Sequence, residues 1–202
     1  MKALVIIDMQ NDFMPGGALA VPGGDQIIPL VNKLQEKFDL VIATQDWHPE
    51  NHSSFADNHH DKENFDTTVI DGLEQTLWPV HCVQTTDGAD FHPHMNAARI
   101  EAIFRKGTDP AIDSYSGFYD NAHKKATGLT GYLKGKGITS LYFCGLAAEY
   151  CVSFSVLDAL EEGFKVTLYE DATRALDAAV FEKMKSQIIE KGGRLKLAGE
   201  LV

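Results

Sequence analysis

The chain has 202 residues, of which 44% are hydrophobic and 23% are charged, and its formal net charge is −11. This length allows one large domain or two small ones with a substantial core, and the composition is that of an ordinary globular protein. The acidic balance argues against nucleic acid and anionic membrane as partners, because both require a basic protein face.

The cysteines and the apolar runs indicate a cytoplasmic protein. Three cysteines without a CxxC pair are more typical of a reducing compartment than of a disulfide framework. The apolar run at residues 3–7 is too short for a signal-peptide core and is followed by Asp8. No stretch approaches the ~20 consecutive apolar residues that span a membrane.

The first part of the chain predicts two buried strands and a helix. Residues 2–7 form a continuous apolar, β-branched run, which is typical of a strand buried on both faces of a parallel sheet. After a turn-rich segment, Asp25 can cap a helix over residues 27–38, whose apolar residues recur at helical spacing. Residues 40–43 predict a second buried strand.

Residues 44–93 form a long polar stretch with only short apolar islands. Such a segment inside a compact domain is usually functional or disordered. It contains six of the eight histidines and both tryptophans. We therefore expect this region to be functional.

The rest of the chain alternates strands and helices. Strands are predicted at 99–105, 138–143, 164–169 and, as a short sixth one, 194–197; helices are predicted at 129–136, 152–162 and 178–191. Residues 109–121 are predicted to be irregular. This alternation indicates an α/β fold, a single domain over 1–202 with a mainly parallel central sheet of about six strands and helices on both faces.

A cysteine lies at the turn between a predicted strand and a predicted helix. Small residues around Ala147 connect the strand at 138–143 to the helix, and Cys151 falls near the first turn of that helix. Unpaired N–H groups and the positive end of the helix dipole favour a thiolate there. For this turn taken alone, a small buried filler is the commoner interpretation of such a cysteine.

Polar residues follow four predicted strands at the edge of the sheet where sites form in open parallel sheets. Asp8 follows the first strand, Asp46 and His48 the second, Lys106 the third and Cys151 the fourth. A cysteine nucleophile needs a base, and its leaving group needs an acid. Asp8 can serve as both in turn, with Lys106 holding the carboxylate and the thiolate. The alternatives are a turn-forming carboxylate and a surface lysine.

A second group of residues is suited to a metal ion. Asp46 and His48 stand two residues apart on an extended segment and so point to the same side. With His81 as a candidate third ligand they form a set suited to Zn²⁺, Fe²⁺ or Mn²⁺. His52 is a further candidate, as a ligand or beside one. The alternative is that these are merely solvated loop histidines.

Six sequence blocks, in order, resemble the nicotinamidase (pyrazinamidase) family of isochorismatase-like cysteine hydrolases. They are VIIDMQNDF at 5–13, TQDWHP at 44–49, WPVHCVQ at 78–84, FRKG at 104–107, DSYSGF at 113–118 and GLAAEYCV at 145–152. The match covers nearly the whole chain, and the joint occurrence of six blocks is highly specific. The resemblance implies a three-layer α/β/α domain that hydrolyses nicotinamide to nicotinate and ammonia in NAD salvage, with pyrazinamide as a further expected substrate.

The resemblance also implies roles for individual residues. The family's triad falls on Asp8, Lys106 and Cys151, and its metal ligands fall on Asp46, His48 and His81, with His52 matching a histidine that ligates or flanks the ion in some members. Its oxyanion hole maps to the backbone N–H groups of Ala147 and Cys151, beside a cis peptide bond between Leu146 and Ala147. Its pocket maps to Phe13, Leu19, Trp78, Tyr115 and Leu146. Ala148-Glu149 stand where members often have Thr-Asp.

The implied chemistry uses a Cys151 thioester, one divalent metal ion (zinc first, iron or manganese as alternatives) that anchors the pyridine nitrogen, and no organic cofactor. The implied partner is a small aromatic amide, and a homo-oligomer is left open.

Three other functions compete. The first is a superfamily relative acting on another amide or ureido substrate, which the metal set and Trp78 argue against. The second is a metallohydrolase whose nucleophile is metal-bound water, with Cys151 only filling space. The third is a non-catalytic metal-binding or interaction module, which a thiol at a helix N-terminus argues against.

Overall fold

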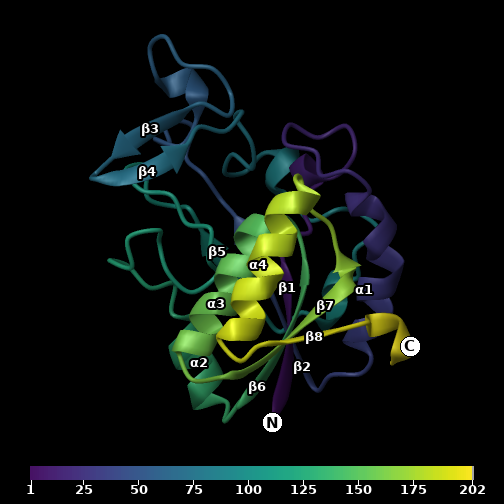
Figure 1. The fold of residues 1–202 in the computed structure, drawn as a ribbon. Helices are drawn as coiled ribbons and strands as arrows, with labels where there is room; N and C mark the ends of the chain where they lie inside the picture. Colours follow the sequence, from purple (N-terminus) through teal and green to yellow (C-terminus); the bar gives the residue numbers. More distant parts are fainter. Residues whose placement is uncertain (202) are drawn as a thin grey trace.

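A six-stranded parallel sheet forms the centre of the protein in the computed structural model, which describes residues 1–201 (Figure 1). The strand order is β5-β2-β1-β6-β7-β8, and all five pairs of neighbours are parallel. The strands are β1 (Lys2–Ile7), β2 (Leu40–Asp46), β5 (Ala102–Lys106), β6 (Ser140–Gly145), β7 (Lys165–Thr173) and β8 (Arg194–Lys196). The predicted α/β class and six-stranded sheet are confirmed.

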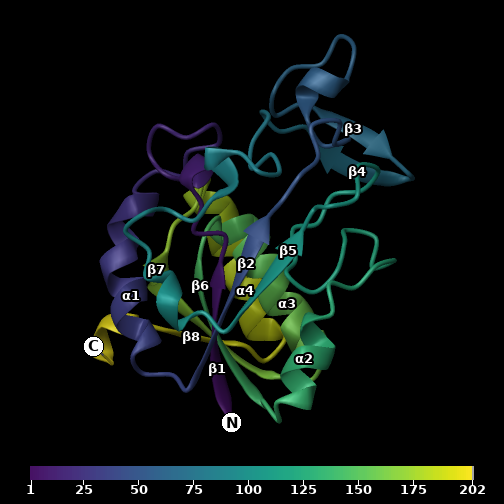
Figure 2. The same cartoon turned by 180° about the vertical axis from the view of Figure 1, so that it is seen from behind.

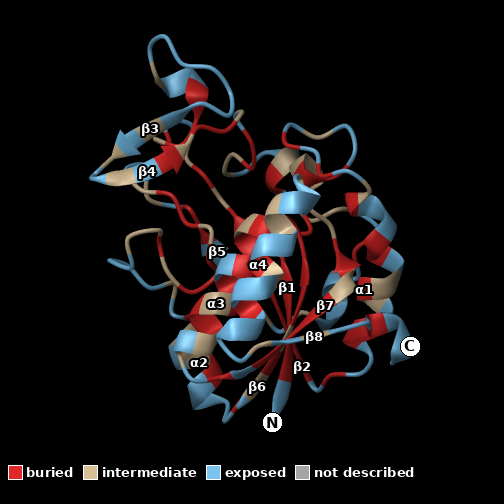
Figure 3. Cartoon of the chain, in the orientation of Figure 1, coloured by how far each residue is buried: buried red, intermediate tan, exposed pale blue. Residues whose placement is uncertain are grey.

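Helices cover both faces of this sheet (Figures 1 and 2). They are α1 (Ile28–Gln35), α2 (Leu129–Gly135), α3 (Ser153–Glu161) and α4 (Ala178–Glu190). Successive side chains of β1 alternate between two cores, as the pleat of a strand requires. Leu4 and Ile6 pack with α1 on one face, and Ala3, Val5 and Ile7 pack with α2, α3 and α4 on the other. Burial is concentrated in the sheet and on these inner helix faces (Figure 3).

The polar stretch at 44–93 contains a hairpin that was not predicted. Strands β3 (Thr67–Ile70) and β4 (Leu73–Thr76) pair antiparallel and stand apart from the central sheet (Figure 2). Their two-residue turn is Asp71-Gly72, with positive φ at both residues, and Asp-Gly is a strong hairpin signal. The third predicted strand also begins later than expected, at Ala102, because Ala97–Arg99 form a 3₁₀ turn.

The carboxyl ends of four adjacent strands deliver polar residues to one edge. Asp46 ends β2, Lys106 ends β5, Asp8 follows β1, and the turn leading to Cys151 follows β6. Gly145 permits that turn, since its φ is +117° and a Cβ would lie 2.1 Å from the Ile7 carbonyl oxygen. Among residues 1–201, no helix is both long and apolar enough to cross a membrane.

Candidate active site

The buried ammonium of Lys106 brings the candidate catalytic residues together. Its Nζ lies 3.0 Å from Asp8 Oδ2, 3.0 Å from Asp46 Oδ1 and 3.3 Å from Cys151 Sγ. It also donates a hydrogen bond to the Ser114 carbonyl at 3.1 Å. Burial lowers the pKa of Lys106, but the Asp46 and Asp8 carboxylates outweigh burial and raise that pKa well above its ordinary value. Lys106 is therefore a permanent cation.

Asp8 is held in position from both sides of its carboxyl group. Thr44 Oγ1 donates to Asp8 Oδ1 at 2.6 Å, while Oδ2 faces Lys106. Burial raises the pKa of Asp8 above its ordinary value of 3.8, against the opposing effect of Lys106. One oxygen of Asp8 lies within 4.8 Å of Cys151 Sγ. A carboxyl group with a raised pKa at this distance suits proton exchange with the thiol.

Cys151 is a thiol in the resting site. Burial raises its pKa well above the ordinary value, and Asp8 and Asp46 raise it further, against the lowering effect of Lys106. This differs from the expectation that the helix N-terminus favours a thiolate. The reason is that burial beside two carboxylates outweighs the effect of the Lys106 ammonium. The nucleophile therefore needs a base, and Asp8 is adjacent.

Cys151 lies in a single π-helical turn, Ala148–Val152, that precedes α3. The Val152 N–H donates to the Ala147 carbonyl at 3.1 Å. The Leu146–Ala147 peptide bond is cis, in agreement with the resemblance. Within the described residues the Ala147 N–H has no hydrogen-bond acceptor, and Ala147 lines the pocket. This N–H is free to bind an oxyanion.

Glu149 joins this turn to the loop before α4. Its buried carboxyl Oε1 accepts a hydrogen bond from the Asp177 N–H at 2.6 Å, and the neighbouring Ala148 N–H donates to the Arg174 carbonyl at 2.8 Å. Burial raises the pKa of Glu149. The pair Ala148-Glu149 thus fixes the loop that supplies Leu176 to the pocket.

Asp46, His48 and His81 converge as a candidate metal group. Asp46 Oδ2 lies 3.1 Å from His48 Nε2 and 3.3 Å from His81 Nε2. Each ring places its Nδ1 against a backbone carbonyl, that of Gly107 at 2.9 Å or of Pro79 at 2.7 Å. Since a carbonyl only accepts, each Nδ1 carries a proton, and Nε2 is the atom of each ring that faces the Asp46 carboxylate and can serve as a metal ligand. Three buried acceptors facing one another fit a divalent cation.

His52 lies outside that group. Its ring is 4.1 Å from the His48 ring, centroid to centroid, and it clusters with His48 and Asp113. The Ser54 N–H donates to its Nδ1 at 3.2 Å. Burial and the neighbouring His48 lower the pKa of His52 to about 4, so that the ring is neutral. His52 does not line the cavity above Cys151.

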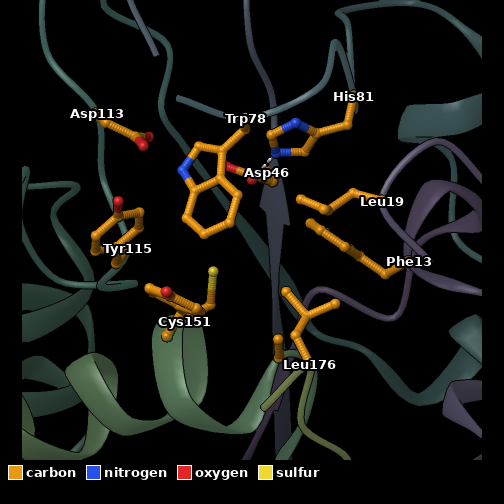
Figure 4. Close-up of a pocket in the computed structure, with 11 residues that line it drawn as sticks. Phe13, Leu19, Asp46, Trp78, His81, Asp113, Tyr115, Cys151 and Leu176 are labelled. Atoms are coloured by element: carbon orange, nitrogen blue, oxygen red, sulfur yellow. Dashed lines mark ion pairs between the residues drawn. The ribbon is translucent and has the colours of Figure 1, made fainter. Parts of the chain in front are cut away.

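A cavity opens above Cys151 (Figure 4). Phe13, Leu19, Trp78 and Tyr115 line it as expected, together with Asp46 and His81 of the metal group. Leu146 does not line it, because its side chain is fully buried and faces Gly24 in the core beneath. Sequence reasoning missed three lining residues, Asp113, Tyr150 and Leu176. The first two lie inside the recognised blocks, whereas Leu176 has no sequence signal.

One side of the cavity is aromatic. Trp78 contacts Tyr150 at 4.9 Å and Tyr115 at 6.2 Å between ring centroids, both nearly perpendicular. We call these three residues the aromatic wall. Phe13, Leu19 and Leu176 lie across the cavity from Trp78 and Tyr115 (Figure 4). The space between the two sides suits a flat ring.

Comparisons with known proteins agree with this geometry. The isochorismatase domain family model matches residues 2–192. The Escherichia coli nicotinamidase is 47% identical over 180 residues, which cover 87% of this chain and 84% of that protein. An Acinetobacter baumannii nicotinamidase structure, 44% identical, superposes with a TM-score of 0.97 over 100% of this chain and 98% of its own. A Pyrococcus horikoshii pyrazinamidase in complex with zinc is 39% identical, with a TM-score of 0.80 over 97% of this chain and 98% of its own. The chain belongs to the isochorismatase domain family and, within it, to the nicotinamidases.

Proposed function

We propose that this protein hydrolyses nicotinamide to nicotinate and ammonia through a thioester on Cys151. The observation that best supports this proposal is the position of the thiol. Cys151 lies in an aromatic-lined cavity, with Asp8 and Lys106 on one side and the candidate metal group bordering the same cavity. Figure 4 shows the sulfur directed into the space beneath Trp78. A planar aromatic amide fits between the aromatic wall and Phe13 and Leu19.

The metal group supports substrate orientation. A divalent cation held by Asp46, His48 and His81 would act as a Lewis acid that anchors the pyridine nitrogen. The zinc in the Pyrococcus horikoshii pyrazinamidase favours zinc here, with iron and manganese as alternatives suited to the same donors. The protein's own residues then carry every chemical step.

Asp8 begins the reaction by taking the proton of the Cys151 thiol. The thiolate attacks the amide carbonyl carbon, and the Ala147 and Cys151 N–H groups stabilise the developing oxyanion. A donor of this kind typically lowers the barrier by about 3 kcal/mol. Asp8 returns its proton to the amide nitrogen as the C–N bond breaks, so that ammonia leaves and the thioester remains.

The second half of the reaction uses the same groups. Asp8 removes a proton from water, whose oxygen attacks the thioester carbonyl. The C–S bond breaks, the proton held by Asp8 passes to the sulfur, and the acid that forms gives its own proton to solvent and leaves as nicotinate. Lys106 keeps its proton throughout, because its pKa stays well above the ordinary value. Its charge stabilises each anion that forms on Asp8 and Cys151.

The proposal is tested by measuring ammonia and nicotinate release from nicotinamide, with metal analysis of the same preparation. We expect equal amounts of both products and about one metal ion per chain. A small amide panel with pyrazinamide, benzamide and an N-carbamoyl amino acid defines the substrate class. Benzamide is the matched control, because it lacks only the ring nitrogen and should react more slowly. Turnover of the ureido compound in place of nicotinamide would assign the chain to a different reaction.

A further inference from the structure

A polar side chain of the exposed hairpin is buried against the substrate pocket. Along β4, Glu74 is exposed whereas Gln75 is only 5% exposed. A buried amide needs hydrogen-bond partners, because leaving its N–H groups without acceptors costs free energy. The hydrogen-bond partners of Gln75 therefore indicate the role of this side chain.

Two of those partners are residues of the pocket. Gln75 Nε2 lies 3.0 Å from Asp113 Oδ2 and 3.1 Å from the Tyr115 hydroxyl oxygen, in addition to 2.7 Å from the Thr76 carbonyl oxygen. Its Oε1 accepts from Asn121 Nδ2 at 3.5 Å. Asp113 and Tyr115 both line the cavity, whereas Gln75 itself does not.

Gln75 thus connects two segments that are far apart in the sequence. Trp78 lies two residues after the end of β4, so the hairpin leads into one member of the aromatic wall. Asp113 and Tyr115 belong to the irregular segment after β5, which carries another. Each segment has backbone restraints of its own: the Trp78 N–H donates to the Ser54 carbonyl at 2.7 Å, and the Tyr115 N–H donates to Asn121 Oδ1 at 2.9 Å. Gln75 links the two segments to each other, since its side chain reaches Asp113 and Tyr115 from the strand that precedes Trp78.

We propose that Gln75 is a positioning residue that fixes the aromatic wall and thereby sets the ring size of the amide that the pocket accepts. This proposal rests on the proposed function of the site. An uncharged amide is suited to the role, because one of its two N–H groups can donate to the Asp113 carboxylate and the other can be shared between the Thr76 carbonyl and the Tyr115 hydroxyl, without placing another charge beside the metal group. Gln75 contacts neither Cys151 nor Asp8, so its effect falls on binding and selectivity.

The experiment compares Gln75→Ala with Glu74→Ala, a matched control on the exposed face of the same strand. The substrates are nicotinamide and quinoline-3-carboxamide, which carries a second fused ring. For Gln75→Ala we expect KM for nicotinamide to rise by about tenfold with kcat changed less than about twofold. We expect the ratio of kcat/KM for nicotinamide over the bicyclic amide to fall by about tenfold. Glu74→Ala should leave both quantities unchanged.

A merely structural role for Gln75 would give other results. An equal loss on both substrates, a loss confined to kcat, or the same change in Glu74→Ala would overturn the proposal. If Gln75→Ala does not fold, as judged by thermal unfolding, Tyr115→Phe removes one of the same hydrogen bonds and should shift the substrate ratio in the same direction. An unchanged ratio there contradicts the proposal.

A failure of the proposed function is recognised separately. Wild-type protein that does not hydrolyse nicotinamide would refute that function. The Gln75 proposal is then decided by the Kd of nicotinamide, followed through the intrinsic fluorescence of the two tryptophans, of which Trp78 lines the cavity. The Kd of nicotinamide should rise in Gln75→Ala and stay at the wild-type value in Glu74→Ala. Equal Kd values in the two variants would overturn the Gln75 proposal.

Discussion

Lys106 has three N–H donors and four acceptors around its ammonium, namely Asp8, Asp46, Cys151 and the Ser114 carbonyl. A lysine ammonium is a compact charge with rotatable donors, whereas a guanidinium imposes a planar fork. Lys106 can therefore shift its hydrogen bonds as negative charge moves between Asp8 and Cys151. Lys106 Nζ links the metal group to the nucleophile, because it contacts both Asp46 and Cys151.

Replacing Cys151 with alanine tests the covalent mechanism. We expect Cys151→Ala to lower nicotinamide hydrolysis by at least about 1,000-fold, since the variant lacks the nucleophile. Metal content should stay at the wild-type level, because Asp46, His48 and His81 are untouched. Ammonia release and metal analysis measure the two effects. Full activity in this variant would favour metal-bound water as the nucleophile.

The acid limb of the pH profile tests the role of Asp8. Only the ionised carboxyl can accept the thiol proton, so kcat/KM falls as Asp8 becomes protonated at low pH. Because burial raises the pKa of Asp8, this fall should lie above pH 3.8. Thr44→Val removes a hydrogen bond that favours the ionised form, so the limb should move to higher pH. A limb that stays in place in Thr44→Val would argue that another group titrates.

The candidate site residues lie at the ends of the parallel strands. The glycine after β5, Gly107, packs against His48 of the candidate metal group. Gly107 has a φ of +63°, its carbonyl accepts from His48, and a Cβ there would lie 2.3 Å from His48 Cε1. Adding a methyl group must displace the histidine ring. This position therefore tolerates only glycine.

Gly107→Ala should disturb metal binding without touching a ligand. We expect bound metal to fall by about tenfold or more and activity to fall with it. Changes to residues that orient a metal ligand typically weaken metal binding by about 10–100-fold. Gly131→Ala in α2 is the control, since its Cβ would meet no atom within 4 Å. That substitution should stabilise the fold by about 0.5–1 kcal/mol. Wild-type metal content in Gly107→Ala would show that the ring can move freely.

Sequence patterns predicted the elements that are buried on both faces better than those that are exposed. Residues 2–7 and 40–43 are apolar throughout because both sheet faces are covered, and these strands were found. The β3–β4 hairpin was missed because its strands carry mixed polar residues and lie mostly exposed. Its Asp71-Gly72 turn was the available signal. Leu176 was missed because a pocket position in a loop follows no periodicity.

Considered as a whole, the molecule has stability concentrated in the central sheet. Strand β1 is paired on both sides and is buried, whereas the hairpin pairs only with itself. We expect amides of β1 and β6 to exchange with solvent only through global unfolding, and amides of β3 and β4 to exchange fastest among the strands. Hydrogen exchange followed by mass spectrometry measures this order. Equal protection of the hairpin and β1 would contradict it.

The candidate site was predictable because topology brings strand ends together. Asp8, Asp46, Lys106 and Cys151 lie at or after the ends of strands that are adjacent in the order β5-β2-β1-β6, so correct strand predictions suffice to gather them. The protonation state of Cys151 was not predictable, since it depends on the balance of burial and three neighbouring charges. The position of Leu146 likewise depends on which way one side chain turns, which no spacing in the sequence specifies.

The depth of the metal group has a kinetic consequence. Asp46, His48 and His81 are each at most 4% exposed, and the cavity reaches this group through Asp46 and His81. A cation that reaches the group through the cavity travels through the space that the substrate occupies. Dissociation of the ion to a chelator should accordingly be slower when nicotinate fills the cavity than when the cavity is empty. Bound substrate or product would then block the exit of the ion and retain it during turnover.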